Sequence, residues 1–306
     1  MVTAALNWLA LYRAHVRAHR GTAVGFAAAL LAILWLFAFS VIEIVAGESW
    51  GPVRLGFLGG LACFAATTVG ALPALILRGV PQRIEDGMLG FAAGIMLAAS
   101  SFSLILPGVD AATLLTGGTG TGAAVVAAGM ALGVVLMLGL DEFIPHEHPT
   151  AGPFGPAQER VNRVWLLVFA IALHNLPEGM AVGVGFSQGD LKVGMPLATA
   201  IGLQDIPEGL AVALALRGVN LSPLRAVLVA AATGVIEPIG AIFGVGLSSG
   251  LPIVYPTGLG LAAGAMIFVV SHEVIPETHR NGHQLPATIG LMGGFIVMML
   301  LDTALG

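Results

Sequence analysis

The sequence predicts an all-α protein, a polytopic bundle of membrane-spanning helices, and two observations support this prediction. Only 9% of the 306 residues are charged and 57% are hydrophobic, with a mean hydropathy of +0.94, whereas soluble domains carry about 25% charged residues. Apolar stretches of about 20 residues, long enough to cross about 30 Å of hydrocarbon as helices, also recur along the whole chain. The expected surroundings are therefore a lipid bilayer, and nothing indicates a nucleic-acid partner.

Nine spans are predicted in a single transmembrane domain covering residues 1–306. They lie near residues 24–46, 53–77, 88–107, 122–140, 164–186, 195–216, 226–247, 252–275 and 286–305. The first span follows a basic segment, but its 23 apolar residues are long for a signal peptide, so we interpret it as a retained helix. If it were cleaved, eight spans with both ends outside would remain.

The positive charges predict the orientation of these spans. Ten of the twelve Lys and Arg residues fall at the amino terminus or in every second connection. Only Arg54 and Lys192 fall on the other side. Because short cytoplasmic loops collect positive charge, we predict a cytoplasmic amino terminus and an external carboxyl terminus in a plasma (inner) membrane. Residues 141–163, rich in Pro and Gly, are predicted to be a flexible cytoplasmic loop.

Small residues and a short internal similarity bear on how the helices pack. The chain contains 43 Gly, which permits close helix packing and is compatible with a homodimer. The segments GFAAGIM (90–96) and GLAAGAM (260–266) fall on predicted spans that run in opposite directions. This suggests an inverted repeat, as in many secondary transporters, although a chance match between Ala/Gly-rich helices is the alternative. The single Cys63 is predicted to be a buried apolar residue.

Two related polar motifs interrupt the apolar pattern. ALHNLPEGMAVG (172–183) is followed about thirty residues later by GLQDIPEGLAVA (202–213). The two fall on neighbouring antiparallel spans, with a centre of symmetry near residues 189–190. Folding there places His174 and Asn175 level with Gln204 and Asp205.

Four acidic side chains are predicted near mid-membrane: Glu178, Asp205, Glu208 and Glu237. Uncompensated, they would cost about 10–14 kcal/mol, at about 2.5–3.5 kcal/mol each. His174 is the one potential positive partner near that depth. A divalent cation would compensate the charge, and so would protonation of some carboxyl groups.

The spacing of the side chains favours a cation. His174 with Glu178, and Gln204 with Glu208, are i,i+4 pairs that project from one helical face. The adjacent Asn175 and Asp205 are turned about 100° and suit a second ion, bridged by a glutamate. Pro177 and Pro207 free backbone carbonyls there, and Glu237-Pro238 repeats the acid-proline pair. The structural alternative is interhelical hydrogen bonding with no metal.

HNLPEG followed by a second polar-x-Pro-Glu-Gly helix resembles the ZIP family of divalent-metal transporters. The resemblance covers spans two to nine, so the fold it implies is eight family helices plus one extra amino-terminal span. Inverted three-helix repeats would flank two metal-binding helices. It also implies transport of zinc or related ions towards the cytoplasm through a mononuclear or binuclear centre. Its expected ligands are His174, Asn175, Glu178, Gln204, Asp205, Glu208 and Glu237.

The second motif departs from many relatives, because Gln204, Asp205 and Pro207 stand where those carry His or Glu. A neutral amide in place of an imidazole favours a broad-specificity, prokaryotic-type transporter over a strictly zinc-selective one. The expected substrates are Zn²⁺ and Cd²⁺, then Fe²⁺ and Mn²⁺, with one or two ions in the centre.

Secondary candidates lie around this centre. Met96 falls at a similar depth and would be a soft thioether ligand, although Met is more often core filler. Candidate cytoplasmic exit or sensor residues, alternatively a solvated loop, are His146, His148, His272, Glu273, Glu277, His279 and His283.

Two other functional classes compete with metal transport. An intramembrane metalloenzyme is disfavoured because HExxH and duplicated Glu-x-x-His motifs are absent from the sequence. A proton-coupled carrier of an organic solute explains the acids but not the His174–Glu178 pair with its matched partner. We therefore predict a transporter with no catalytic residues and no resident cofactor.

Overall fold

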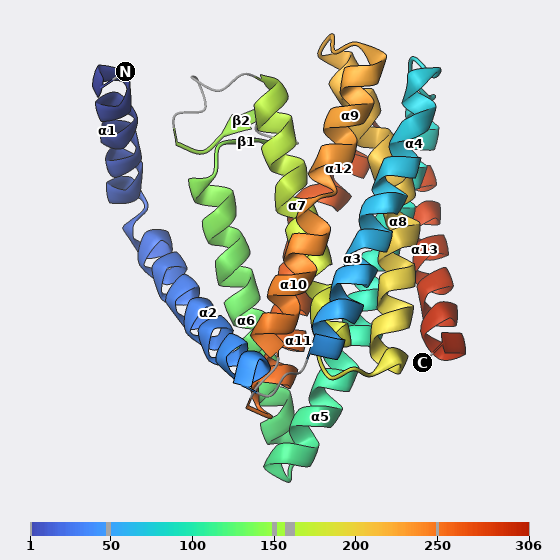
Figure 1. Ribbon diagram of the computed structural model, residues 1–306. Coiled ribbons are helices and arrows are strands. Elements are labelled where there is room, and N and C mark those ends of the chain that lie inside the picture. The colour runs from blue at the N-terminus through green and yellow to red at the C-terminus, as the bar shows by residue number, and fades with distance from the viewer. Residues whose placement is uncertain (1, 47–49, 149–151, 157–162, 249–250, 306) are drawn as a thin grey trace.

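The computed structural model describes residues 2–46, 50–148, 152–156, 163–248 and 251–305, and this part of the chain forms a helical bundle (Figure 1). The first half contains α1 (Val2–Ala18), α2 (Arg20–Ala46), α3 (Trp50–Ala71) with the 3₁₀ turn η1 (Leu72–Leu75), α4 (Gln82–Ala99), η2 (Ser100–Ile105), α5 (Leu106–Thr116) and α6 (Thr119–Phe143). The second half contains α7 (Arg163–Phe186), α8 (Leu191–Gly218), α9 (Pro223–Thr233), α10 (Ile236–Ser248), α11 (Val254–Val269), η4 (Val270–Val274), α12 (Ile275–His279) and α13 (Gln284–Leu305).

The helical fold class is confirmed, with nine candidate membrane spans in the described residues. The third span is much longer than predicted, because α4, η2 and α5 run on from Gln82 to Thr116. The seventh is broken, since α9 and α10 are separated by a turn at residues 234–235. A break at membrane depth requires burial within protein or beside a polar cavity, and this one precedes Glu237.

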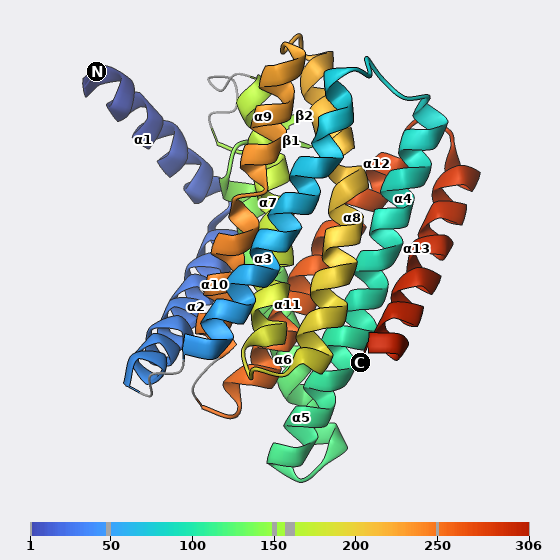
Figure 2. The ribbon, with the colours of Figure 1, turned by 45° about the vertical axis from the view of Figure 1, so that its right-hand side comes forward.

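Two features were absent from the predictions. Helix α1 precedes the first span and stands apart from the bundle in both views (Figures 1 and 2). The connection after α6 contains a short antiparallel pair, β1 (His146–His148) with β2 (Gly152–Phe154). Figure 1 places this pair at the same end of the bundle as the amino terminus, so that end carries structure beyond a plain loop.

Helices α7 and α8 occupy the interior. Helix α7 contacts α3, α8, α10 and α11, while α8 also contacts α3 and α4. Of the span windows, 67% of that in α7 and 56% of that in α8 are buried, against 11% in α13. The two helices that carry the polar motifs are therefore shielded from lipid by the others.

The two Ala/Gly-rich segments have matching structural surroundings. Each leads into a π-helical stretch, η2 after α4 and η4 after α11. Each stretch begins ten residues after the start of its segment, at Ser100 and at Val270. Helix α4 packs against α13 and α11 packs against α6. This correspondence goes beyond a seven-residue sequence match.

Candidate metal centre

The polar motifs of α7 and α8 face each other inside the bundle. Both helices continue through Pro177 and Pro207. The Gln204 amide nitrogen donates a hydrogen bond to Glu178 Oε1. His174 Nδ1 lies 3.8 Å from Glu208 Oε1. These contacts pair His174 with Glu208 rather than placing it level with Gln204, so the register differs by about one helical turn from the one predicted.

Three carboxylates meet at the α7–α8 contact. Single ligand atoms of Glu178, Asp205 and Glu208 all lie within 4.8 Å of one another. Glu178 is 1% exposed and Asp205 2%, while the Glu208 side chain is 15% exposed. Three acids this close in a buried setting repel one another strongly unless a cation or protons compensate their charge.

Glu237 joins the cluster from α10. It lies in the first turn of that helix, directly after the break, and is fully buried. Thr67 on α3 donates a hydrogen bond of 2.7 Å to Glu237 Oε1, and the Asn175 amide lies 3.4 Å from the same oxygen. The amino terminus of α10 favours negative charge at this position. Cys63 also lies here, because its sulfur and oxygens of Asp205 and Glu237 are within 4.8 Å of one another.

The glycine that ends each Pro-Glu-Gly motif permits this convergence. A Cβ on Gly179 would lie 2.3 Å from the Glu237 carbonyl oxygen. A Cβ on Gly209 would lie 2.3 Å from the Thr67 carbonyl oxygen. Both distances are far below van der Waals contact. The glycines therefore let α10 and α3 approach close enough to present Glu237 and Thr67 beside the motif glutamates.

The cluster contains four buried side-chain oxygens that accept no hydrogen bond within the described residues: Glu178 Oε2, Gln204 Oε1, Asp205 Oδ2 and Glu237 Oε2. Buried polar atoms are normally paired. Carboxylate and amide oxygens with an adjacent imidazole form a donor set that suits a divalent transition metal.

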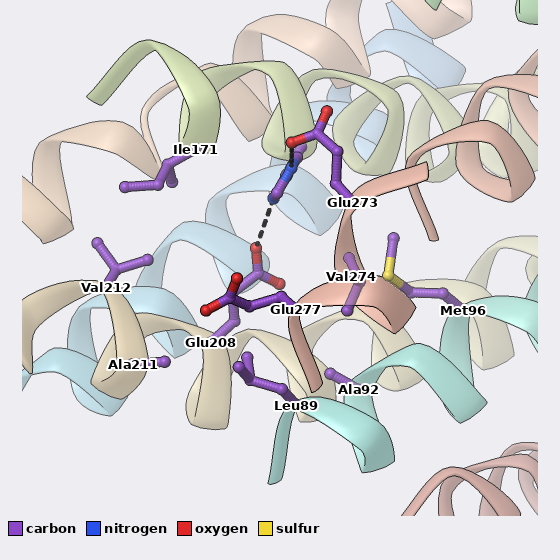
Figure 3. Close-up of a pocket in the computed structure, with 11 residues that line it drawn as sticks. Leu89, Ala92, Met96, Ile171, Glu208, Ala211, Val212, Glu273, Val274 and Glu277 are labelled. Atoms are coloured by element: carbon purple, nitrogen blue, oxygen red, sulfur yellow. Dashed lines mark hydrogen bonds and ion pairs between the residues drawn. The ribbon is translucent and has the colours of Figure 1, made fainter. Parts of the chain in front are cut away.

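A cavity of about 130 Å³ adjoins the cluster. Figure 3 shows Glu208, Glu273 and Glu277 around it, with Met96 on the wall. His174 Nε2 lies 2.7 Å from Glu273 Oε2, so this imidazole sits between the carboxylates of Glu273 and Glu208. Met96 is 1% exposed and lines the same cavity as His174 and Glu208.

The remaining predicted exit residues separate into different environments. His146 Nε2 lies 3.1 Å from Asp141 Oδ1, and His272 Nε2 lies 3.7 Å from Asp141 Oδ2. Ligand atoms of Asp141, His146 and Glu273 are all within 4.8 Å of one another. Glu273, which lines the cavity, is therefore close to Asp141 at the end of α6 and to His146 in β1.

Two of the predicted histidines are engaged elsewhere. The His279 ring bonds its own helix at the Ile275 carbonyl. His283 Nδ1 lies 2.8 Å from Asp86 Oδ2 on α4. The side chain of His148 lies outside the described residues. Neither His279 nor His283 lines the cavity beside Glu208.

The surroundings of His146 raise its pKa above the ordinary 6.5. Burial lowers the pKa, but the hydrogen bond to Asp141, the bond to the Ile144 carbonyl and the charges of Asp141 and Glu273 outweigh it. His146 Nδ1 donates to the Ile144 carbonyl at 2.8 Å, which leaves Nε2 to face Asp141. These contacts therefore stabilise the charged form of the His146 ring relative to that of a free imidazole.

Three contributors to the centre were not recognised as such in the sequence. Glu273, a predicted exit residue, contacts His174 directly. Thr67 and Cys63 on α3 gave no signal beyond being small residues in an apolar helix. The one sequence signal was the position of Glu273, an acid inside the predicted span 252–275; the structure shows it to be 2% exposed.

The fold and site define an integral membrane protein with a buried, acidic, metal-compatible centre between two motif-bearing helices. The family model described as "ZIP Zinc transporter" matches residues 146–302. Zinc transporter ZIPB of Bordetella bronchiseptica is 59% identical over 295 residues, covering 96% of each chain. Zinc transporter GufA of Myxococcus xanthus is 42% identical (82% of this chain, 99% of the relative), and zinc transporter ZIP11 of Homo sapiens is 33% identical (85% and 99%). The chain belongs to the ZIP family of zinc transporters.

Proposed function

We propose that the protein moves Zn²⁺ and related divalent ions towards the cytoplasm through the centre between α7 and α8. The four unpartnered buried oxygens of Glu178, Gln204, Asp205 and Glu237 are the observation that carries this proposal. A doubly positive ion would satisfy them and offset the mutual repulsion of the acids. A transported ion must also leave the centre, so its binding to these acids has to be reversible.

The ligands divide into two groups, which supports room for two ions. His174, Glu208 and Met96 face the cavity. Asn175, Asp205 and Glu237 lie on the α10 side, where the Asn175 amide contacts Glu237. Glu178 is within reach of Asp205 and Glu208, so it would bridge the groups. The Gln204 amide and Met96 suit a broad range of ions, Cd²⁺ included.

The cavity supports release at the end of the bundle that carries β1 and β2. Glu277 on α12 lines it, and Asp141 and His146 lie beyond Glu273. Towards the opposite turn at residues 187–190, the interior of α7 and α8 is filled by fully buried apolar side chains: Ala181, Val184, Leu197 and Ile201. This is the arrangement expected of a site open to one side, and alternating access would require the other side to open in turn.

An inverted repeat would supply that movement. The π-helical stretches at equivalent positions after GFAAGIM and GLAAGAM support one. So do the matching α4–α13 and α11–α6 contacts. In this proposal the repeats rock around α7 and α8 while the centre stays at the same depth.

The alternative functions lose their support. ZIP proteins are transporters rather than enzymes, so family membership excludes the intramembrane metalloenzyme. A proton-coupled organic carrier does not require His174 between two carboxylates beside four orphaned oxygens. Flux of an organic solute in metal-free buffer would instead favour the organic-solute carrier.

Purified protein in liposomes tests the proposal. Uptake of Zn²⁺ and Cd²⁺ should disappear in Glu178→Gln and Glu208→Gln, which keep side-chain size and remove charge. Glu85→Gln, at the start of α4 and outside the cluster, is the matched control and should keep uptake. All variants should elute as single species with unchanged helix content. Full uptake in both cluster variants would refute the transport path.

Orientation and assembly need their own measurements. The arginine-rich connections support a cytoplasmic amino terminus and external carboxyl terminus in the plasma (inner) membrane. Alkaline phosphatase fused after residue 305 should be active, and fused in the connection near Asn220 it should be inactive. The reverse result would invert the direction of transport. Mass measurement in lipid discs tests for the homodimer with which the glycine-rich helices are compatible.

A further inference from the structure

A second group of metal-ligating side chains lies where the amino-terminal helices meet the end of α6. His15 on α1 and His19, in the junction before α2, are i,i+4 neighbours. His15 Nε2 lies 2.8 Å from Glu142 Oε1, and His19 Nδ1 lies 3.2 Å from the same oxygen. The sequence gives no signal that links these histidines to Glu142, because more than 120 residues separate them.

This group is distinct from the transport centre. None of its members lines the cavity beside Glu208. Glu142 is the next residue after Asp141, but Asp141 contacts His146 and His272, whereas Glu142 contacts the histidines of the amino-terminal helices. Successive helical residues point about 100° apart, so α6 ends with two acids that serve two different histidine groups.

The separations match those of ligands around zinc. With zinc-ligand bonds of about 2.0–2.1 Å and tetrahedral angles, neighbouring ligand atoms lie about 3.3 Å apart. The two imidazole-to-carboxylate distances here are 2.8 and 3.2 Å, and all three ligand atoms are within 4.8 Å of one another. His15 Nε2 also lies 3.0 Å from the Glu142 backbone carbonyl oxygen, so a bound ion would take the place of that hydrogen bond.

The exposure of the group fits a site that exchanges with solvent. The Glu142 side chain is 13% exposed, His15 22% and His19 43%. An ion held by these three ligands would keep a water as its fourth. Without a metal, one carboxylate oxygen faces two imidazoles whose rings stack 4.6 Å apart.

We propose that His15, His19 and Glu142 form a second binding site for a divalent transition metal such as Zn²⁺. The bound ion would tie the α1–α2 junction to the end of α6. In both views most of α1 stands away from the bundle, and its ring contacts with α6, from Tyr12 and His15 to Phe143, lie beside the proposed site (Figures 1 and 2). The site does not depend on the proposed transport path.

The first test measures bound metal by equilibrium dialysis with Zn²⁺ on full-length protein. The background variant Glu178→Ala/Glu208→Ala removes ligands of the central site, so transport failure and failure of this site are distinguishable. Adding His15→Ala/His19→Ala to that background should remove one equivalent of zinc. Adding His279→Ala, a histidine held by its own helix backbone, should remove none. An unchanged count in the His15/His19 variant would overturn the proposal.

The second test measures the α1–α2 segment itself. Arg13, Arg17 and Arg20 are exposed around the site, so trypsin should cut there. If cleavage requires local opening, Zn²⁺ at ten times its dissociation constant should slow it roughly tenfold. Glu142→Gln and His15→Ala/His19→Ala should abolish the slowing, whereas His279→Ala should retain it. Equal protection in all variants would show that zinc acts elsewhere.

Discussion

Replacing Gly179 by alanine is expected to disrupt the centre without altering any predicted ligand. The added Cβ would lie 2.3 Å from the Glu237 carbonyl oxygen and 2.8 Å from its Cα. Ordinary contact begins at 3.4 Å, so α10 must retreat by about 1.1 Å, the difference between 3.4 and 2.3 Å. Overpacking of this kind costs about 1–3 kcal/mol of stability. Because Glu237 moves with its backbone, metal affinity should fall by about 10–100-fold, as when a group that orients ligands is lost.

The matched control is Gly202→Ala on the neighbouring helix α8. A Cβ there would have Ala66 Cβ at 3.8 Å as its nearest neighbour. Both substitutions gain about 0.5–1 kcal/mol of helix propensity, so their difference isolates the α7–α10 clash. Thermal unfolding in detergent and Cd²⁺ titration would be measured for both. If Gly179→Ala matched Gly202→Ala in melting temperature and Cd²⁺ affinity, the close approach of α7 and α10 would not be what positions Glu237.

Three further predictions concern single groups. Thr67→Val should weaken Zn²⁺ binding about tenfold because Glu237 loses a hydrogen bond, whereas Thr67→Ser keeps the hydroxyl donor and should keep the original affinity. Equal Zn²⁺ affinities of the two variants in titration calorimetry would contradict this role. Gln204→His should raise the ratio of Zn²⁺ to Mn²⁺ affinity, since imidazole suits zinc better; an unchanged ratio in competition dialysis would show that the amide does not set selectivity. The pKa of His146, measured by NMR, should lie above 6.5. The contact of His146 with Asp141 should therefore stabilise the fold fully below pH 6.5, and this stabilisation should be lost as pH rises through the raised pKa. Asp141→Asn should lower the pKa of His146, and an unchanged titration midpoint would exclude Asp141 as the cause of the shift.

The sequence by itself determined the fold class and the number of membrane spans. In lipid, the backbone of a long apolar segment must satisfy its own hydrogen bonds, which a helix does. Composition and span length are therefore enough to predict the helices. The Pro-Glu-Gly motifs also identified α7 and α8 as the helices to examine, because buried acids in such segments demand compensation. The i,i+4 spacing placed His174 and Glu178 on one face without any tertiary information.

Only the tertiary structure decided which distant residues complete each group. Glu273 contacts His174 across 99 residues of sequence, and Thr67 contacts Glu237 across 170. These contacts depend on how closely the helix backbones approach at positions such as Gly179. The local periodicity of the sequence does not indicate which helices approach one another. The break before α10, the β1–β2 pair and the His15–His19–Glu142 group depend on the same long-range packing. A side chain's partners are fixed by neighbouring helices, whereas its own helix fixes only its direction.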